Sequence, residues 1–262
     1  MIFSYFDDSS DDRRDRFVAT GGVVGTEELV AIFEGMWIAE TKHLKSPFRS
    51  TDCECRKGQF INSTKLDCDA LISNLVDLLS HKGNLVGKVA SVVPVPLYRE
   101  VFPDCSVDDP VCLSVAHLIF EMGREGKRQN LPVKLWFEDS KRDRRLITRV
   151  YRQIKSLSSW NGVEREMLSG ISFGDKTLAP LQAADLVARE AFKACDNLGI
   201  RNYRIPLKRM WETSAFVLWG RDGLEILKAN GWPSKIDAIL ALPASVDFRQ
   251  RRRDQTILFA SK

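Results

Sequence analysis

The sequence predicts an α/β fold in which helices cover a central sheet. Apolar strands alternate with helical patterns along most of the chain, and such alternation places neighbouring strands parallel beneath helices. The length of 262 residues suits one large domain with an appendage. A hydrophobic fraction of 44% and a charged fraction of 28% are ordinary for a globular protein, so the composition argues against a disordered chain.

The chain opens with a predicted β-hairpin. An apolar strand over 2–6 ends at two aspartates, and a polar turn leads to a second strand over 16–24. Thr26 followed by two glutamates is a helix-start signal, and the apolar residues after it share one face of a helix over 26–44. The segment 46–60 lacks periodicity, so we expect a long loop there.

Helix and strand alternate in the middle of the chain. Apolar residues at helical spacing predict a helix over 63–81, and prolines end the β-rich segment 85–95. Asp109 and the proline after it start another helix. The apolar strand 131–137 follows and leads directly into Glu138.

The last elements repeat this alternation. A helix over 144–157, a strand over 167–173 and a helix over 179–197 are predicted from their periodicity and from the proline that opens the last of them. The remaining segment has a helical pattern. We therefore expect one domain over 1–198 and a helical C-terminal extension over 199–262 packed on it.

Cysteine use and targeting signals predict an intracellular protein. No apolar run is long enough to span a membrane, and the first residues lack the features of an export signal, so we expect a cytoplasmic protein without membrane contact. The six cysteines are scattered, which predicts free thiols. A zinc site built from Cys53, Cys55, His43 and Cys68 is disfavoured because no second paired-cysteine motif accompanies it.

Acidic side chains stand at three places where α/β sheets commonly carry active sites. Asp7 and Asp8 follow one strand, Glu138 and Asp139 follow another, and Asp185 borders the apolar face of a helix. Mg²⁺ and Mn²⁺ prefer carboxylate and water oxygens, so acids that converge from separate elements predict a divalent-metal site. Two such ions can activate water and stabilise the leaving oxygen in phosphodiester hydrolysis.

Each acidic group also has a structural interpretation. The two aspartates after the first strand can form a polar turn, and the acids after the later strand can cap the following helix. Asp185 can pair with Arg189 one helical turn later. The metal hypothesis depends on the three groups coming together.

Two motifs resemble those of a bacterial family known as domain of unknown function 3800. The segment 5–10, Tyr-Phe-Asp-Asp-Ser-Ser, is similar to the family's N-terminal Asp-Glu motif. The segment 181–188, which contains Gln182 and Asp185, is similar to its C-terminal Gln-x-x-Asp motif and is the more specific match. The resemblance covers about residues 1–198. It implies a ribonuclease H-like fold, with a mixed sheet flanked by helices and an acidic metal-binding cluster.

The sequence departs from the family pattern at three positions. Asp8 replaces a glutamate, Ser10 replaces a glycine, and Arg49 stands where relatives often carry histidine. The first change keeps the charge and shortens its reach. The second stiffens the turn.

Basic side chains predict a nucleic-acid partner. One face of the helix over 144–157 gathers arginines without acids, and such a face can neutralise phosphates and release counterions. A solvated helix face is the other interpretation. The C-terminal cluster Arg249–Arg253 can bind nucleic acid or a protein partner, and a homodimer is left open. The candidate nucleic-acid-binding residues are Lys141, Arg145, Arg149, Arg152 and Arg49.

We predict from the sequence a metal-dependent nuclease that hydrolyses phosphodiester bonds of RNA or DNA. The alternative is a noncatalytic nucleic-acid- or protein-binding module of a bacterial defence or mobile-element system, which the departures at Asp8 and Arg49 favour. A hydrolase of small phosphate esters is a third candidate, and no Gly-rich phosphate loop suggests an NTPase. The expected roles are primary ligands of Mg²⁺ or Mn²⁺ for Asp7, Glu138 and Asp185, secondary ligands for Asp8 and Asp139, and positioning of water or substrate for Gln182.

Overall fold

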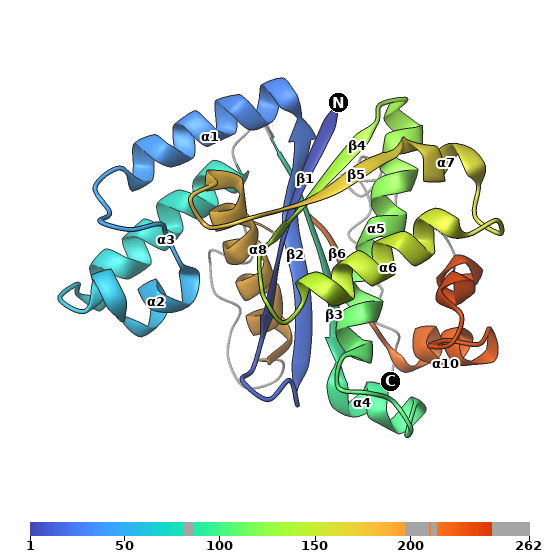
Figure 1. Ribbon diagram of the computed structural model, residues 1–262. Coiled ribbons are helices and arrows are strands. Elements are labelled where there is room, and N and C mark those ends of the chain that lie inside the picture. The colour runs from blue at the N-terminus through green and yellow to red at the C-terminus, as the bar shows by residue number, and fades with distance from the viewer. Residues whose placement is uncertain (81–85, 197–209, 211–213, 243–262) are drawn as a thin grey trace.

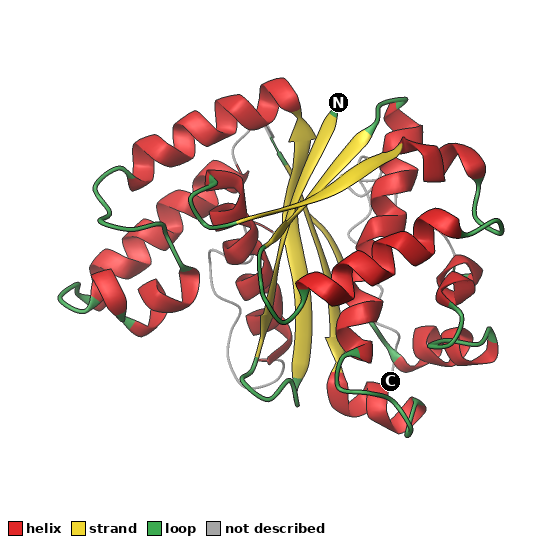
Figure 2. Cartoon of the chain, in the orientation of Figure 1, coloured by secondary structure: helices red, strands yellow, loops and turns green. Residues whose placement is uncertain are grey.

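A six-stranded mixed sheet forms the centre of the molecule, and helices cover both of its faces (Figures 1 and 2). This computed structural model describes residues 1–80, 86–196, 210 and 214–242. The α/β fold class predicted from the sequence is confirmed at this level. The strands are β1 (Ile2–Ser10), β2 (Phe17–Thr26), β3 (Gly87–Pro94), β4 (Val133–Glu138), β5 (Leu168–Gly174) and β6 (Ser214–Leu218).

The strands lie in the order β5-β4-β1-β2-β3-β6. β2 runs antiparallel to both of its neighbours, β1 and β3, as the predicted hairpin requires. β4 pairs parallel with β1, and β5 pairs parallel with β4. The carboxyl ends of β1, β4 and β5 therefore lie at the same edge of the sheet, where polar groups that follow these strands can meet.

Two hydrophobic cores lie on opposite faces of the sheet. One is formed with α1, α3 and α8, and the other with α5 and α6 (Figure 1). The helices are α1 (Glu27–Thr41), α2 (Ser50–Cys55), α3 (Lys65–Ser80), α4 (Val95–Val101), α5 (Asp109–Gln129), α6 (Arg144–Ser156), α7 (Gly162–Met167), α8 (Ala179–Asp196) and α10 (Arg221–Ala229). Short 3-10 helices are η1 (Gly58–Phe60) and η2 (Ile236–Ala241).

Three predictions about the elements are corrected. The segment 46–60 is not a plain loop, because it contains α2 and η1. The first strand does not end at the two aspartates, because β1 continues to Ser10 and contains Asp7 and Asp8. The short helices α4 and α7 are further elements that the sequence did not predict. The C-terminal extension is not wholly helical, because β6 pairs parallel with β3 and extends the main sheet. The arginine cluster 249–253 lies outside the described residues.

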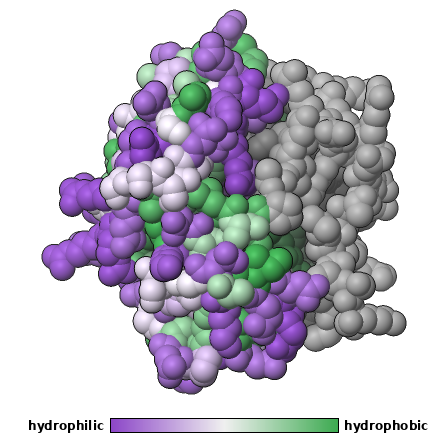
Figure 3. Space-filling model, turned by 90° about the vertical axis from the view of Figure 1, so that its right-hand side faces the viewer, coloured by the Kyte–Doolittle hydropathy of each residue, from purple (hydrophilic) through white to green (hydrophobic). Residues whose placement is uncertain are grey.

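On the side of the molecule that carries α7 and α10, the described residues are mostly hydrophilic at the surface (Figure 3). There, hydrophilic residues surround a smaller apolar area (Figure 3). Among the described residues, no helix is both long and apolar enough to cross a membrane.

Candidate functional site

The alternation of side chains along β1 separates the two aspartates that the sequence singled out. Phe6 lies in the core beneath α5 and α6, so Asp7 points to the opposite face, toward α8, and Asp8 points back toward α5 and α6. On the parallel neighbour β4, Phe137 packs against Phe6 and Glu138 takes the other face. Asp7 and Glu138 thus lie on the same face of adjacent strands.

A glycine lets α8 pack directly over Asp7. Gly21 of β2 is the register partner of Asp7, and a Cβ atom on Gly21 would lie 2.7 Å from the backbone of Ala188. Only glycine permits this close approach of helix and strand. Asp185 precedes Ala188 by three residues and shares its side of α8, so it is carried toward the sheet beside Asp7.

The three carboxylates converge on a lysine that the sequence did not single out. The Lys176 ammonium contacts Asp7 Oδ2, lies 3.3 Å from Asp185 Oδ1 and lies 3.7 Å from Glu138 Oε2. Its side chain is only 4% exposed. We call these four residues the acid–lysine cluster. Asp7, Glu138 and Asp185, the predicted primary ligands, are therefore brought together, with a cation of the protein's own between them.

The charges in the acid–lysine cluster depend on one another. Burial raises the pKa of Asp7 well above its usual value, and the carboxylates of Asp185 and Glu138 add to this against the attraction of Lys176. Burial opposes ionisation of Asp185, but Lys176 and hydrogen bonds from Ser50 outweigh it and lower the pKa of Asp185. Burial likewise opposes the charge on Lys176, yet the three acids raise the pKa of the lysine. Lys176 and Asp185 are thus a charged pair, and Asp7 is the acid that most readily keeps a proton.

Ser50 holds one oxygen of Asp185. Its backbone N–H donates to Asp185 Oδ2 at 2.7 Å, and its hydroxyl donates to the same oxygen at 2.5 Å. Ser50 is the first residue of α2, in the segment expected to be a loop. The hydroxyl and the N–H fix the carboxylate, so that Oδ1 is directed at Lys176.

Gln182 braces the site through contacts with protein groups. Its Oε1 accepts hydrogen bonds from Trp37 Nε1 and from the backbone N–H of Phe48, both at 3.1 Å. Its Nε2 donates to the backbone carbonyl of Lys176 at 2.8 Å. The side chain is buried, and it ties the segment before α2 to the segment after β5. The structure thus gives Gln182 a positioning role, whereas the sequence suggested contact with water or substrate.

The two secondary ligand candidates lie outside the acid–lysine cluster. Asp8 lies 3.4 Å from the guanidinium of Arg14, and burial together with the neighbouring Asp143 raises the pKa of Asp8. Asp139 pairs with Arg144 at 3.0 Å on the surface. Neither carboxylate is among the ion-pair partners that the described part of the chain offers Lys176.

The structural interpretations of Asp185 and of the acids at the end of β4 do not hold. Asp185 does not pair with Arg189, which binds Glu54 at 3.0 Å instead. The acids after β4 give no side-chain cap to α6, whose N-cap residue is Asp143. The convergence at Lys176 is therefore not explained by helix capping or by a local ion pair on α8.

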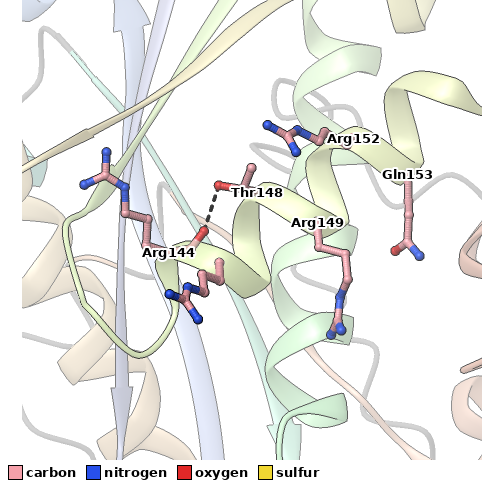
Figure 4. A pocket seen from close by; sticks show the side chains of 6 residues that line it. Arg144, Thr148, Arg149, Arg152 and Gln153 are labelled. Atoms are coloured by element: carbon pink, nitrogen blue, oxygen red, sulfur yellow. Dashed lines mark hydrogen bonds between the residues drawn. The ribbon is translucent and has the colours of Figure 1, made fainter.

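The basic face of α6 borders an open hollow of about 530 Å³ (Figure 4). Arg145, Arg149 and Arg152 have no carboxylate within 4 Å among the described residues, so their charge is uncompensated there. Lys141 is exposed in the turn before α6. Arg49 is exposed at the start of α2, between two residues whose backbone N–H groups bind Gln182 and Asp185. The lining residues are Arg144, Arg145, Thr148, Arg149, Arg152 and Gln153.

The cysteines do not assemble a zinc site in the described part of the chain. All six are free, Cys55 is exposed, and buried Cys53 directs its thiol at the backbone carbonyl of Cys68. Among the described residues no group of three or more His, Cys, Asp or Glu side chains is arranged to hold a metal ion. The carboxylates of the acid–lysine cluster surround the ammonium of Lys176, which is where a metal ion bound by them would lie.

Comparison of the chain with protein-family models, curated proteins and solved structures finds no match. The resemblance to domain of unknown function 3800 stays a prediction from the two sequence motifs.

Proposed function

We propose that this chain is a metal-dependent nuclease of ribonuclease H-like fold that hydrolyses phosphodiester bonds of RNA or DNA. One observation carries the proposal. Carboxylates from three separate elements, Asp7 of β1, Glu138 of β4 and Asp185 of α8, converge around one atom at the edge of the sheet where the parallel strands end. Sequence-distant acids gathered in this way are the donor set that Mg²⁺ or Mn²⁺ needs.

The donor set fits a divalent cation if the ammonium of Lys176 withdraws. The oxygens are hard ligands, and two of the three carboxylates keep some exposure, 24% for Glu138 and 17% for Asp185. Lysine carries its charge on a flexible stem, so the side chain can leave while the backbone stays in place. A bound cation would polarise a phosphate and activate the attacking water. Within the chain, Ser50 keeps Asp185 oriented and Gln182 keeps the segments around it in register.

The ribonuclease H-like part of the proposal is supported by the sheet and by the place of the acids on it. A three-stranded antiparallel unit, β1–β3, is extended on one side by the parallel strands β4 and β5. Asp7 lies in β1 just after the last residue that pairs with β4, Glu138 is the last residue of β4, and Asp185 lies on the helix packed across β2.

Nucleic acid is the substrate class that the basic groups favour. Four arginines of α6 line the hollow, and three of them have no carboxylate within 4 Å among the described residues. Guanidinium groups bind phosphate oxygens with good geometry. α6 begins only a few residues after Glu138, so its basic face and the acid–lysine cluster belong to consecutive elements. α6 packs on the opposite face of the sheet from the acid–lysine cluster, so a phosphate backbone bound along α6 would have to pass the end of β4 at Glu138 to reach the acids.

One observation favours the noncatalytic alternative. Lys176 already supplies a positive charge at the centre of the acids, so the cluster is compatible with a purely structural ion pair in a nucleic-acid-binding module. Such a module would bind nucleic acid without metal, and its affinity would fall steeply with salt.

Hydrolysis of labelled single-stranded and duplex RNA and DNA, with Mg²⁺ or Mn²⁺, tests the proposal. Wild type should cleave at least one of these substrates, and Asp7→Asn and Asp185→Asn should lose the activity. Asp139→Asn is the matched control, because Asp139 is exposed and pairs with Arg144. Equal activity of all four proteins would rule out the assignment. Metal-independent binding without turnover would select the noncatalytic module.

A further inference from the structure

The position of Lys176 has a consequence for metal binding in the free protein. Its ammonium contacts Asp7 and lies 3.3 Å from Asp185 Oδ1 and 3.7 Å from Glu138 Oε2. A divalent cation bound by the same oxygens, at roughly 2.1 Å from each, would lie within a few ångströms of the ammonium. Two positive charges at that separation in a buried site repel strongly. Ammonium and metal ion therefore exclude one another.

We propose that Lys176 is an internal counter-ion that keeps divalent metal out of the free protein, and that a nucleic-acid phosphate draws its side chain aside so that metal and substrate bind together. The inference rests on the proposed function. It adds an order of binding to that function: the nucleic-acid substrate must bind before the metal site becomes available.

Apart from the three acids, few polar contacts in the described part of the chain hold the ammonium of Lys176, whereas its main chain is fixed. Gln182 holds the backbone carbonyl of Lys176 at 2.8 Å, which fixes the main chain at this point. Apart from the three acids, the ammonium has one recorded contact among the described residues, with the carbonyl of Leu181 at 3.4 Å. Its position thus depends mainly on charges that a metal ion would neutralise in its place.

The direction from which a phosphate would approach follows from the exposure of the three acids. The Asp7 side chain is only 2% exposed, whereas Glu138 and Asp185 remain partly open. A phosphate at the open side would offer the ammonium new acceptor oxygens in a charge-assisted hydrogen bond. The same phosphate would supply a ligand to the metal ion that takes the vacated position.

Thermodynamic linkage makes this dependence measurable. If nucleic acid raises the affinity for metal, metal must raise the affinity for nucleic acid by the same factor. Removal of the ammonium should uncouple the two. Lys176→Met, which keeps the length of the side chain, should bind metal without nucleic acid, at least about tenfold more tightly than wild type does.

The experiment measures Mn²⁺ binding to the full chain by electron paramagnetic resonance, which reports free Mn²⁺. Wild type, Lys176→Met and the double variant Lys176→Met with Asp185→Asn are titrated with Mn²⁺ alone. The Mn²⁺ titrations are then repeated in the presence of a short phosphorothioate oligodeoxynucleotide. The Mn²⁺ that binds to the oligonucleotide without protein is measured separately and subtracted. We expect weak binding to wild type alone, binding at least about tenfold tighter with oligonucleotide, and tight binding to Lys176→Met in both conditions. The double variant should bind weakly throughout.

The outcomes separate the inference from the proposed function. Tight Mn²⁺ binding by wild type alone, equal to that of Lys176→Met, overturns the inference and leaves the nuclease proposal standing. Absence of Mn²⁺ binding by both proteins with and without oligonucleotide overturns both proposals. If Lys176→Met folds poorly, the two wild-type titrations still decide: no gain in Mn²⁺ affinity with oligonucleotide contradicts the inference.

Discussion

Two neighbouring aspartates of β1 lie on opposite faces of the sheet, each in a cluster of three acidic side chains around one basic side chain. Toward α8, three acids surround the ammonium of a lysine; toward α5 and α6, three acids surround the guanidinium of an arginine. The first cluster contains Asp7, Glu138, Asp185 and Lys176. The second contains Asp8, Asp108, Asp143 and Arg14.

The kind of cation makes the difference between the clusters. Arg14 binds both oxygens of Asp143, at 3.1 and 2.8 Å, in the planar fork geometry that fixes a guanidinium. Lys176 presents a single charged atom on a flexible stem and makes no such fork. The arginine cluster therefore locks the β1–β2 turn to the start of α6. The lysine cluster lacks this lock, and our proposal requires that it opens for a metal ion.

The largest expected contrast is in stability. Arg14→Met leaves Asp143 buried without its partner and should lower the free energy of unfolding by about 3 kcal/mol. Mn²⁺ should not restore this loss. Lys176→Met should also be destabilised in chelator, but Mn²⁺ should restore it because the metal replaces the ammonium. Urea unfolding with and without Mn²⁺ measures both effects, and recovery of Arg14→Met by Mn²⁺ would contradict the distinction.

The second contrast is between the adjacent aspartates themselves. If the nuclease proposal holds, Asp7→Asn should lower the rate of hydrolysis by about a hundredfold or more, because Asp7 is a predicted metal ligand. Asp8→Asn should stay within about threefold of wild type, because Asp8 faces Arg14 on the other side of the sheet. Single-turnover cleavage assays measure both variants. Equal losses would show that the faces are not separate in function.

The elements with a full hydrophobic period were predictable from the sequence. α3, α5 and α8 have enough turns to show an apolar face, and the strands before Asp7 and Glu138 show their apolar runs. The short helices α2, α4 and α7 have six or seven residues, which is less than two full turns, so an apolar face does not repeat in them. The place of β6 depends on pairing with β3, which lies far earlier in the chain, so local pattern did not reveal it.

The acids of the site were predictable from the sequence, whereas the lysine between them was not. In the sequence, Asp7 and Glu138 follow apolar runs and Asp185 borders an apolar helix face, and those are local signals. Burial of Lys176 depends on three acids that belong to other elements, and no pattern in the residues next to Lys176 predicts it. Its place two residues after the end of β5 is the one signal that the sequence offered.

A third prediction tests whether the α5 face is a dry structural core. Burial, with a contribution from Arg124, lowers the pKa of His117 to about 3. Below pH 6.5, which is about the pKa of a histidine in an unfolded chain, His117 is protonated in the unfolded state but not in the folded state. The free energy of unfolding therefore falls as the pH falls below about 6.5. Between pH 7 and pH 5 this histidine should cost about 2 kcal/mol.

The control for this pH effect is His117→Gln, which cannot titrate. Urea unfolding of wild type and variant at the two pH values isolates the contribution of His117. The variant should lose about 2 kcal/mol less than wild type does. Identical pH dependence of the two proteins would show that His117 is accessible to protons and that this face is not dry.

The smallest expected effect concerns the support of Asp185. Ser50→Ala removes the hydroxyl donor and keeps the backbone donor, so it should cost about 1 kcal/mol of stability. It should also raise the pKa of Asp185 toward its usual value, because one stabilising hydrogen bond is lost. Ser50→Thr, which keeps the hydroxyl, is the matched control. Unfolding curves that are the same for all three proteins would show that Ser50 does not hold the carboxylate.

A crystal structure with Mn²⁺ and a phosphorothioate oligonucleotide would show whether a metal ion replaces the ammonium of Lys176 among the three carboxylates. Anomalous diffraction measured at the manganese absorption edge distinguishes the ion from water and lighter ions. We expect an anomalous peak bounded by Asp7, Glu138 and Asp185, with the ammonium of Lys176 moved away from them. Oligonucleotide bound along α6 with no peak at these carboxylates, and with Lys176 still among them, would contradict this expectation.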